Sequence, residues 1–238
     1  MARKWIKILQ RMGRRRGVEI SKFPGFGTVA YAMKFCGVDT VLDVGANVGQ
    51  TGETLRDMHF KGRIISFEPL SDAFRILSER AKGDGNWSCH QWALGAEEGE
   101  AEIGVAEHSE FSSFLKTTGF VEEMDAGSKR TRVEKVKVRR LDKVWGELKL
   151  DGAKVLLKID TQGFEKNVLE GAAGVLDKIA AVQMEMSVHP IYEGQPSYDA
   201  MVGYMKDHGY VVAGFMPGGN DPRTGEMVEF DGVFVRCR

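Results

Sequence analysis

The stretch VLDVGANVGQ, residues 41–50, constrains the fold of this chain most strongly. A short apolar run rich in β-branched residues ends at Asp43, and Gly45 and Gly49 then enclose a tight turn. Apolar runs of this length bounded by glycine are typical of strands buried in a parallel sheet. The next segment, 51–60, has the apolar spacing of a helix. The sequence therefore predicts a strand–turn–helix unit whose turn lies at the ligand-binding edge of an α/β sheet.

The rest of the chain alternates strand-like and helix-like segments, which indicates βαβ units and a mostly parallel sheet. Strands are predicted at 40–45, 62–69, 87–95, early in 98–116, at 131–141, early in 153–176, and at 180–188, 210–215 and 231–236. Helices are predicted at 25–38, 51–60, 71–82, late in 153–176 and at 197–210. Because no helix separates the last two strands, they are expected to form a hairpin at the sheet edge. Residues 106–132 lack clear periodicity, which favours a lid or binding loop.

Composition excludes several broad classes of protein. With 42% hydrophobic and 28% charged residues, the 238-residue chain is not disordered and is long enough for one sizeable α/β domain. A net charge of −1 gives no general attraction to nucleic acid. We find no membrane-spanning run and no signal-peptide core, so a cytoplasmic location is expected. The three cysteines, Cys36, Cys89 and Cys237, are widely spaced, which predicts free thiols in a reducing compartment.

The N-terminus differs in charge from the rest of the chain. Residues 1–16 carry seven Lys or Arg and no acid, so residues 17–238 carry −8. One interpretation is an amphipathic helix whose residues 3–16 contact an anionic membrane surface or an acidic partner. The other is a terminal helix that packs on the domain. We therefore divide the chain into a basic N-terminal helix or tail, 1–24, and an α/β domain, 25–238.

The glycine turn and the acid after the second strand predict the ligand. Gly45 and Gly49 allow a ligand to approach the backbone, and Glu68 is placed to accept both hydroxyls of an adenosine ribose. Asn47 stands where a dinucleotide-binding turn has its central glycine, and Asp43 would repel a diphosphate. S-adenosylmethionine, with its ammonium, sulfonium and ribose, fits better than NAD; a turn without a ligand is the remaining alternative. The predicted cofactor-binding residues are Asp43, Gly45, Ala46, Asn47, Gly49, Gln50, Glu68, Pro69, Ala93, Leu94 and Asp160.

Several motifs together resemble the FkbM family of S-adenosylmethionine-dependent methyltransferases. They run in order from about residue 38 to 236 and include LDVGANVGQ, SFEPLS, LLKIDTQGFEKNVLEGA, VQMEMSVHPIYEGQP and FDGVFVR. The resemblance implies a class I (Rossmann-like) methyltransferase fold for the 25–238 domain: a mostly parallel seven-stranded sheet with one antiparallel strand near its edge and helices on both faces. It also implies O-methylation of hydroxyls on sugars, glycans or related secondary metabolites. Some relatives have glutamate where this chain has Gln162.

Three residues are candidates for catalysis. Asp160 ends a predicted strand and would act as a general base, as a ligand of the acceptor hydroxyl or of a metal, or as a helix N-cap. Glu185 lies in an apolar strand, where a carboxylate is costly unless it is paired or functional. These two acids could share a proton, bind a sugar or hold a divalent ion, but two carboxylates are too few to predict a metal site. His189 is an alternative base or an ordinary loop residue.

The acceptor is expected to meet a second group of side chains. These are Ser112 and Ser113 in the long loop, Gln162 and Glu165 after the strand that ends at Asp160, and Tyr192 as a stacking partner. The alternatives are an ordinary polar loop for the serines and favourable electrostatics at a helix N-terminus for Glu165. A small-molecule or glycan acceptor and no nucleic acid are expected, and a homodimer is left open. Rival functions are methylation of a natural product, peptide or nucleic acid, NAD-dependent oxidoreduction, and a scaffold that binds S-adenosylmethionine without catalysis.

Overall fold

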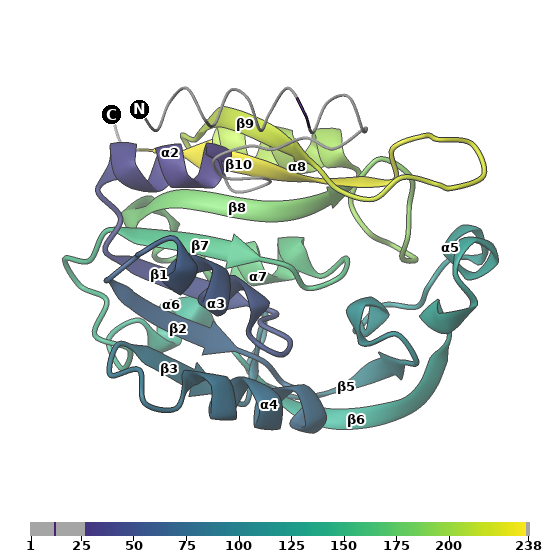
Figure 1. The fold of residues 1–238 in the computed structure, drawn as a ribbon, viewed down its shortest axis with the longest axis horizontal. Coiled ribbons are helices and arrows are strands. Elements are labelled where there is room, and N and C mark those ends of the chain that lie inside the picture. Colours follow the sequence, from purple (N-terminus) through teal and green to yellow (C-terminus); the bar gives the residue numbers. More distant parts are fainter. Residues whose placement is uncertain (1–11, 13–26, 237–238) are drawn as a thin grey trace.

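The main sheet has the predicted architecture. The structure, a computed structural model, describes Met12 and residues 27–236, and its seven-stranded sheet has the order β3-β2-β1-β7-β8-β10-β9 (Figure 1). Neighbouring strands from β3 to β8 are parallel, whereas β10 is antiparallel to both β8 and β9. The strands are β1 (Thr40–Val44), β2 (Arg63–Phe67), β3 (Trp87–His90), β7 (Val155–Ile159), β8 (Ile179–Ser187), β9 (Val211–Pro217) and β10 (Glu229–Val235). The single antiparallel strand and the C-terminal hairpin are therefore confirmed.

Helices cover both faces of this sheet. Successive side chains of a strand point to opposite faces, so a strand that is apolar throughout presents apolar side chains on both. In β1, Val41 belongs to the apolar cluster that contains Leu55 and Leu77 of the helices on one face. Its neighbour Leu42 packs with Val168 and other residues of the helices on the opposite face. The first face carries α2 (Gly27–Cys36), α3 (Gln50–Asp57) and α4 (Ser71–Ala81), and the second carries α6 (Leu141–Val144), α7 (Glu165–Gly171) and α8 (Tyr198–Asp207).

A second, three-stranded sheet corrects one predicted strand. Residues 87–95 form two strands, β3 in the main sheet and β4 (Ala93–Leu94) in a small sheet of order β4-β6-β5. The other members are β5 (Gly99–Ala106) and β6 (Arg130–Arg139). The pairing of the strands shows where the chain passes from one sheet to the other. His90 still pairs with Phe67 of the main sheet, whereas Ala93 pairs with Val138 of the small sheet. Figure 1 shows the small sheet extending beyond the carboxyl ends of the main strands.

The segment 106–132 contains short helices rather than one open loop. It forms η1 (Ser109–Phe111), α5 (Gly119–Met124) and η2 (Ala126–Ser128). Val121 of α5 is fully buried and packs with Ile191 and Tyr192 of the loop after β8. The backbone N–H of Thr118 also donates to the Ile191 carbonyl, at 2.8 Å. Segment 106–132 is thus fastened to the loop that follows β8, and whether it moves as a lid stays a prediction.

Two expectations about the chain as a whole have partial outcomes. Cys36 is disulfide-bonded, which corrects the prediction of free thiols at that position, whereas Cys89 is free. Among the described residues, no helix has the length and apolarity needed to cross a bilayer. Both interpretations of the basic segment 1–24 fall outside the described residues, apart from Met12, which is exposed.

Candidate active site

A cavity of about 370 Å³ lies at the carboxyl ends of β1, β2 and β7. This is the edge where α/β sheets bind ligands, because the strand order reverses beside β1. Most of the predicted site residues come together in its wall: Gly45, Ala46, Asn47, Gln50, Glu68, Pro69, Ala93, Leu94, Ser112, Asp160, Gln162 and Glu185. Segments that are far apart in the sequence therefore form one site.

The glycine turn is shaped by packing more than by the approach of a ligand. Gly45 has φ +76°, and a Cβ there would lie 1.8 Å from the carbonyl oxygen of Asp160. Gly49 has φ +96°, and its Cβ would lie 3.0 Å from the Leu77 side chain. Gly49 does not line the cavity. Gly45 thus lines the cavity as predicted and also makes room for the backbone after β7, whereas Gly49 makes room for helix α4 and lies outside the lining.

The Glu68 carboxylate is held rigidly at the cavity wall. Its Oε2 accepts a hydrogen bond from the Asn47 backbone N–H at 2.8 Å, and its Oε1 accepts one from the Leu70 N–H at 2.9 Å. The residue is only 5% exposed, and burial raises the pKa of Glu68 to about 7 although both N–H groups lower it. A carboxylate offers about four acceptor positions, so each oxygen keeps one for a ligand hydroxyl. This geometry suits a pair of neighbouring ribose hydroxyls.

Ligand affinity should therefore depend on pH through Glu68. Its pKa is raised to about 7, so the carboxyl is mostly protonated at pH 6 and mostly ionised at pH 8. Only the ionised form accepts two hydroxyl donors, so S-adenosylhomocysteine should bind roughly tenfold more tightly at pH 8 than at pH 6. Calorimetric titrations at both pH values test this expectation. The Glu68→Gln variant should bind more weakly at both, with no such dependence; an unchanged tenfold dependence in that variant would assign it to another group.

A buried ion triad lies beneath the cavity. The Lys158 ammonium is 3.3 Å from Oδ1 of Asp43 and 3.2 Å from Oδ2 of Asp160. Burial opposes the lysine charge, but the two carboxylates together raise the pKa of Lys158 above its usual range. Asp43 is fully buried and does not line the cavity, so the structure gives no support to its predicted place among the cofactor-binding residues. Its neighbour in space is Lys158, which does line the cavity.

Gln162 connects the residues around the far side of the cavity. Its Nε2 donates to Asp160 Oδ1 at 3.0 Å and to Glu185 Oε2 at 2.8 Å. Its Oε1 accepts from the Tyr192 hydroxyl at 2.6 Å, and its backbone carbonyl accepts from the Ser113 hydroxyl at 2.6 Å. Gln162 also has a left-handed backbone, with φ +56°. Its neighbours therefore fix both its amide and its backbone, and Gln162 in turn orients the two acids.

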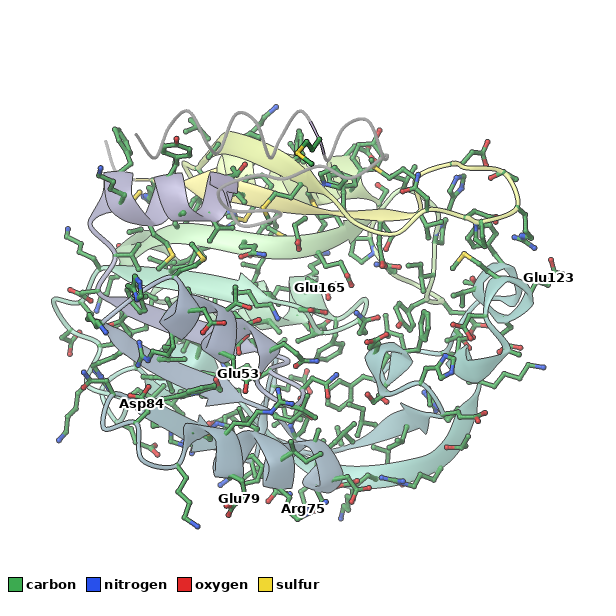
Figure 2. All side chains as sticks on the ribbon, in the orientation of Figure 1. Glu53, Arg75, Glu79, Asp84, Glu123 and Glu165 are labelled. Carbon is green, nitrogen blue, oxygen red and sulfur yellow. The ribbon has the colours of Figure 1, made fainter. Side chains whose placement is uncertain are left out.

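Three residues predicted to contact the acceptor support the wall from behind instead. Ser113 is 2% exposed, Tyr192 is 1% exposed, and neither lines the cavity. Glu165, also buried, accepts hydrogen bonds from the Thr161 and Gly163 backbone N–H groups and thus fastens the turn after β7. Glu165 is the first residue of α7 and is labelled in Figure 2. Stacking of an acceptor on Tyr192 is thus corrected, because its ring is covered.

His189 also lies away from the cavity. Its Nε2 is 3.9 Å from Glu226 Oε2, and its ring contacts Phe120 at a centroid distance of 5.4 Å. No atom of His189 lines the cavity, which corrects its prediction as an alternative base. Ser112, by contrast, does line it, and its hydroxyl accepts a hydrogen bond from the Ala106 N–H at 3.2 Å.

Lys158 and Glu229 are among the cavity residues that were not predicted from the sequence. Lys158 is a charged residue inside the buried run LLKID, and the argument that singled out Glu185 in its apolar strand would have found it. Glu229 was missed because the last strand was predicted to begin at residue 231, whereas β10 begins at Glu229. The antiparallel pairing of β10 with β8 brings Glu229 to the cavity beside Glu185.

Acids dominate the charge of the far wall. Burial and the neighbouring Asp160 raise the pKa of Glu185 well above its usual range and that of Glu229 to about 7. Lys158 is the only cationic side chain that lines the cavity within the described residues, and two acids already pair with it. The described residues contain no group of three or more His, Cys, Asp or Glu arranged to hold a metal ion. The wall can therefore exchange protons and accept hydrogen bonds near neutral pH.

The sheet order, the antiparallel strand β10 and the carboxylate beside the glycine turn define a class I methyltransferase. The family model described as the methyltransferase FkbM domain matches residues 43–212. The chain therefore belongs to the FkbM methyltransferase family, and its cofactor is S-adenosyl-L-methionine.

Known proteins resemble the chain at different levels. The AMB antimetabolite synthetase AmbE of Pseudomonas aeruginosa is 28% identical over 205 residues, which is 73% of this chain and 10% of that protein. The chain thus spans about a tenth of the length of this curated relative. Magnesium protoporphyrin IX methyltransferase from Synechocystis PCC 6803, a structure with bound S-adenosylmethionine, is 11% identical, with a TM-score of 0.46 over 89% of this chain and 79% of that one. A putative RNA methyltransferase from Pyrococcus horikoshii is 13% identical, with a TM-score of 0.45 over 89% and 83%.

The cavity residues fit S-adenosylmethionine. Glu68 keeps two acceptor positions for ribose hydroxyls, and Pro69, Ala93 and Leu94 offer apolar contact to a flat base. Asp160 also lines the cavity, and its negative charge would favour a cationic group of the cofactor. Ala46 and Asn47 of the glycine turn line the same cavity. The wall thus meets each chemical part of the cofactor with a suitable group.

Proposed function

We propose that this chain is an O-methyltransferase that acts on a hydroxyl of a sugar, glycan or related secondary metabolite. The main support is the far wall of the cavity, where Asp160, Gln162, Glu185 and Glu229 stand next to the cofactor residues. Carboxylate and amide oxygens accept hydrogen bonds from hydroxyl groups, and a polyol acceptor offers several. The membership in the FkbM methyltransferase family agrees with this proposal.

The residues of the chain have separate tasks in this proposal. When bound, the cofactor supplies a methyl group made reactive by its positive sulfur. Glu68 fixes the ribose, and Asp160, held by Lys158 and Gln162, fixes the position of the acceptor hydroxyl. Such alignment supplies much of the rate acceleration, on the order of several kcal/mol. The buried supports behind Gln162 keep this geometry from relaxing.

A natural-product acceptor is the second candidate, because the relative in Pseudomonas aeruginosa is named as an antimetabolite synthetase. A nucleic-acid acceptor fits less well. Binding of phosphodiesters relies on free Lys and Arg side chains, whereas among the residues that the structure describes the one lysine in the cavity wall is paired with two acids. We also propose that the protein works in the cytoplasm, as its sequence predicts.

The test is transfer of a radiolabelled methyl group from S-adenosylmethionine to a panel of acceptors. The panel holds methyl glycosides, nucleotide sugars, oligosaccharides, hydroxylated natural products and a short RNA. We expect transfer to a hydroxyl of one of the first four groups, with an O-methyl signal in the NMR spectrum of the product, and no transfer in Glu68→Ala. Transfer to the RNA alone, or to nitrogen or carbon, would contradict the proposal.

A further inference from the structure

We propose that Glu229 is the general base that removes the proton from the acceptor hydroxyl. This inference rests on the proposed O-methylation and assigns one of its steps to a side chain that the sequence analysis missed. Glu229 begins β10, opposite Ser187 of β8, and lines the cavity. It approaches the cavity from the strand next to the one that carries Glu185.

The Glu229 side chain is free to act on a ligand. Within the described part of the chain, no hydrogen bond or ion pair engages its carboxylate, whereas its backbone is fixed by bonds to Gly218 and Gly219. The carboxylate is partly buried, so a ligand in the cavity can reach it while water around it is limited. A rigid backbone and an unpaired carboxylate are what a proton acceptor requires.

Three of the four other acids that line the cavity already accept hydrogen bonds within the protein, and the fourth, Glu110, is exposed. Asp160 has one oxygen on the Lys158 ammonium and the other on the Gln162 amide. Glu185 accepts from the same amide, and burial raises the pKa of Glu185 well above its usual range. Glu68 belongs to the ribose side of the cavity and already accepts two backbone N–H groups. Glu229 is therefore the carboxylate best suited to receive a proton.

The chemistry of the step balances without a further reactant. The acceptor oxygen forms a bond to the methyl carbon while the methyl–sulfur bond breaks and leaves its electron pair on sulfur. The hydroxyl proton moves to the Glu229 carboxylate and then to solvent. Burial and the nearby acids Asp160 and Asp231 raise the pKa of Glu229 to about 7, so the group is a fair base that is still half ionised at neutral pH.

Two measurements on full-length protein test this assignment. In the first, protein labelled with ¹³C at glutamate side chains is titrated by NMR, and the Glu229 signal is identified by its loss in Glu229→Gln. We expect a titration midpoint near pH 7. A midpoint below about pH 5.5 would overturn the proposal, because such a carboxylate is too weak a base; this arm needs no acceptor.

The second measurement is turnover of the hydroxyl acceptor that the wild-type protein methylates fastest in the panel above. We expect Glu229→Gln to lower kcat by about 10²–10⁴-fold. The dissociation constant for S-adenosylhomocysteine should stay within about threefold, and the loss of kcat below pH 7 at saturating substrates should vanish. The matched control is Glu226→Gln, on the same hairpin but outside the cavity, which should keep wild-type turnover.

The two proposals fail in different ways. If Glu229→Gln retains more than a third of the wild-type kcat, Glu229 is not the base, whereas O-methylation stands. If the wild type binds S-adenosylhomocysteine but methylates no hydroxyl, the proposed function is wrong and the base assignment falls with it.

Discussion

Replacement of Lys158 by methionine should destabilise the protein by about 3–5 kcal/mol, because it leaves a buried carboxylate without its partner. The Asp43 side chain is fully buried, and its other polar neighbour is the Ser66 hydroxyl, at 3.4 Å. Methionine fills much of the volume of the lysine stem, so the lost charge dominates the effect. Chemical denaturation followed by circular dichroism gives the change in unfolding free energy. Lys154→Met, at an exposed position nearby, is the control and should change stability by less than about 0.5 kcal/mol.

A second substitution and a change of pH test whether the unpaired Asp43 carboxylate causes this loss of stability. Asp43→Asn combined with Lys158→Met removes both charges and should recover a large part of the lost stability. Burial already raises the pKa of Asp43, so its folded form holds a proton more tightly than its unfolded form does. Its contribution to stability therefore falls as pH rises, and Lys158→Met should be less harmful at pH 5 than at pH 8. A double variant no more stable than Lys158→Met would contradict this explanation.

Gly45→Ala should cost about 3 kcal/mol and distort the site. Alanine at φ +76° is strained, and its Cβ would overlap the Asp160 carbonyl oxygen at 1.8 Å. The backbone of β1 or β7 must then shift, and overpacking of this kind costs about 1–3 kcal/mol beyond the strain. Because Asp160 is the displaced residue, S-adenosylhomocysteine binding should weaken together with stability. Both are measured on the same sample by denaturation and calorimetry.

Gly225 has a similar backbone conformation to Gly45 but open surroundings. Its replacement therefore separates backbone strain from the steric overlap with Asp160. Gly225 has φ +78°, and a Cβ there would meet nothing within 4 Å. Gly225→Ala should therefore cost only about 1 kcal/mol and leave ligand affinity unchanged. Equal losses in the two variants would show that strain alone, and not the contact with Asp160, explains the need for glycine at 45.

Local sequence patterns predict the centre of the main sheet well because β1, β2 and β7 are short, mostly apolar and followed by a clear turn. The run 41–50 places β1, its turn and the start of α3, and Pro69 after Glu68 marks the end of β2. The small sheet could not be predicted in the same way. Its strand β4 has two residues, too few for any periodicity, and its pairing with β6 joins segments about 45 residues apart.

The cofactor side of the cavity was also predictable, whereas the far wall was not. Glu68 and the turn from Gly45 to Asn47 lie close together in sequence and belong to one supersecondary unit. The roles of Asp43 and Tyr192 depend on which face of an element is covered, and that depends on distant partners, Lys158 for one and Gln162 for the other. Glu229 enters the cavity because β10 is inserted antiparallel beside β8, so its position follows from topology.

The central claim is that the cavity beside Glu68 binds the methyl donor, and calorimetric binding of S-adenosylhomocysteine at pH 8 tests it most directly. We predict micromolar binding to the wild type and at least 100-fold weaker binding to Glu68→Ala, since two hydrogen bonds to a charged group are lost, each worth about 1.5–3 kcal/mol. Glu53→Ala, on the exposed side of α3 (Figure 2), should bind like the wild type. Equal affinity in wild type and Glu68→Ala, or no binding to the wild type, would contradict the assignment of this cavity as the donor site.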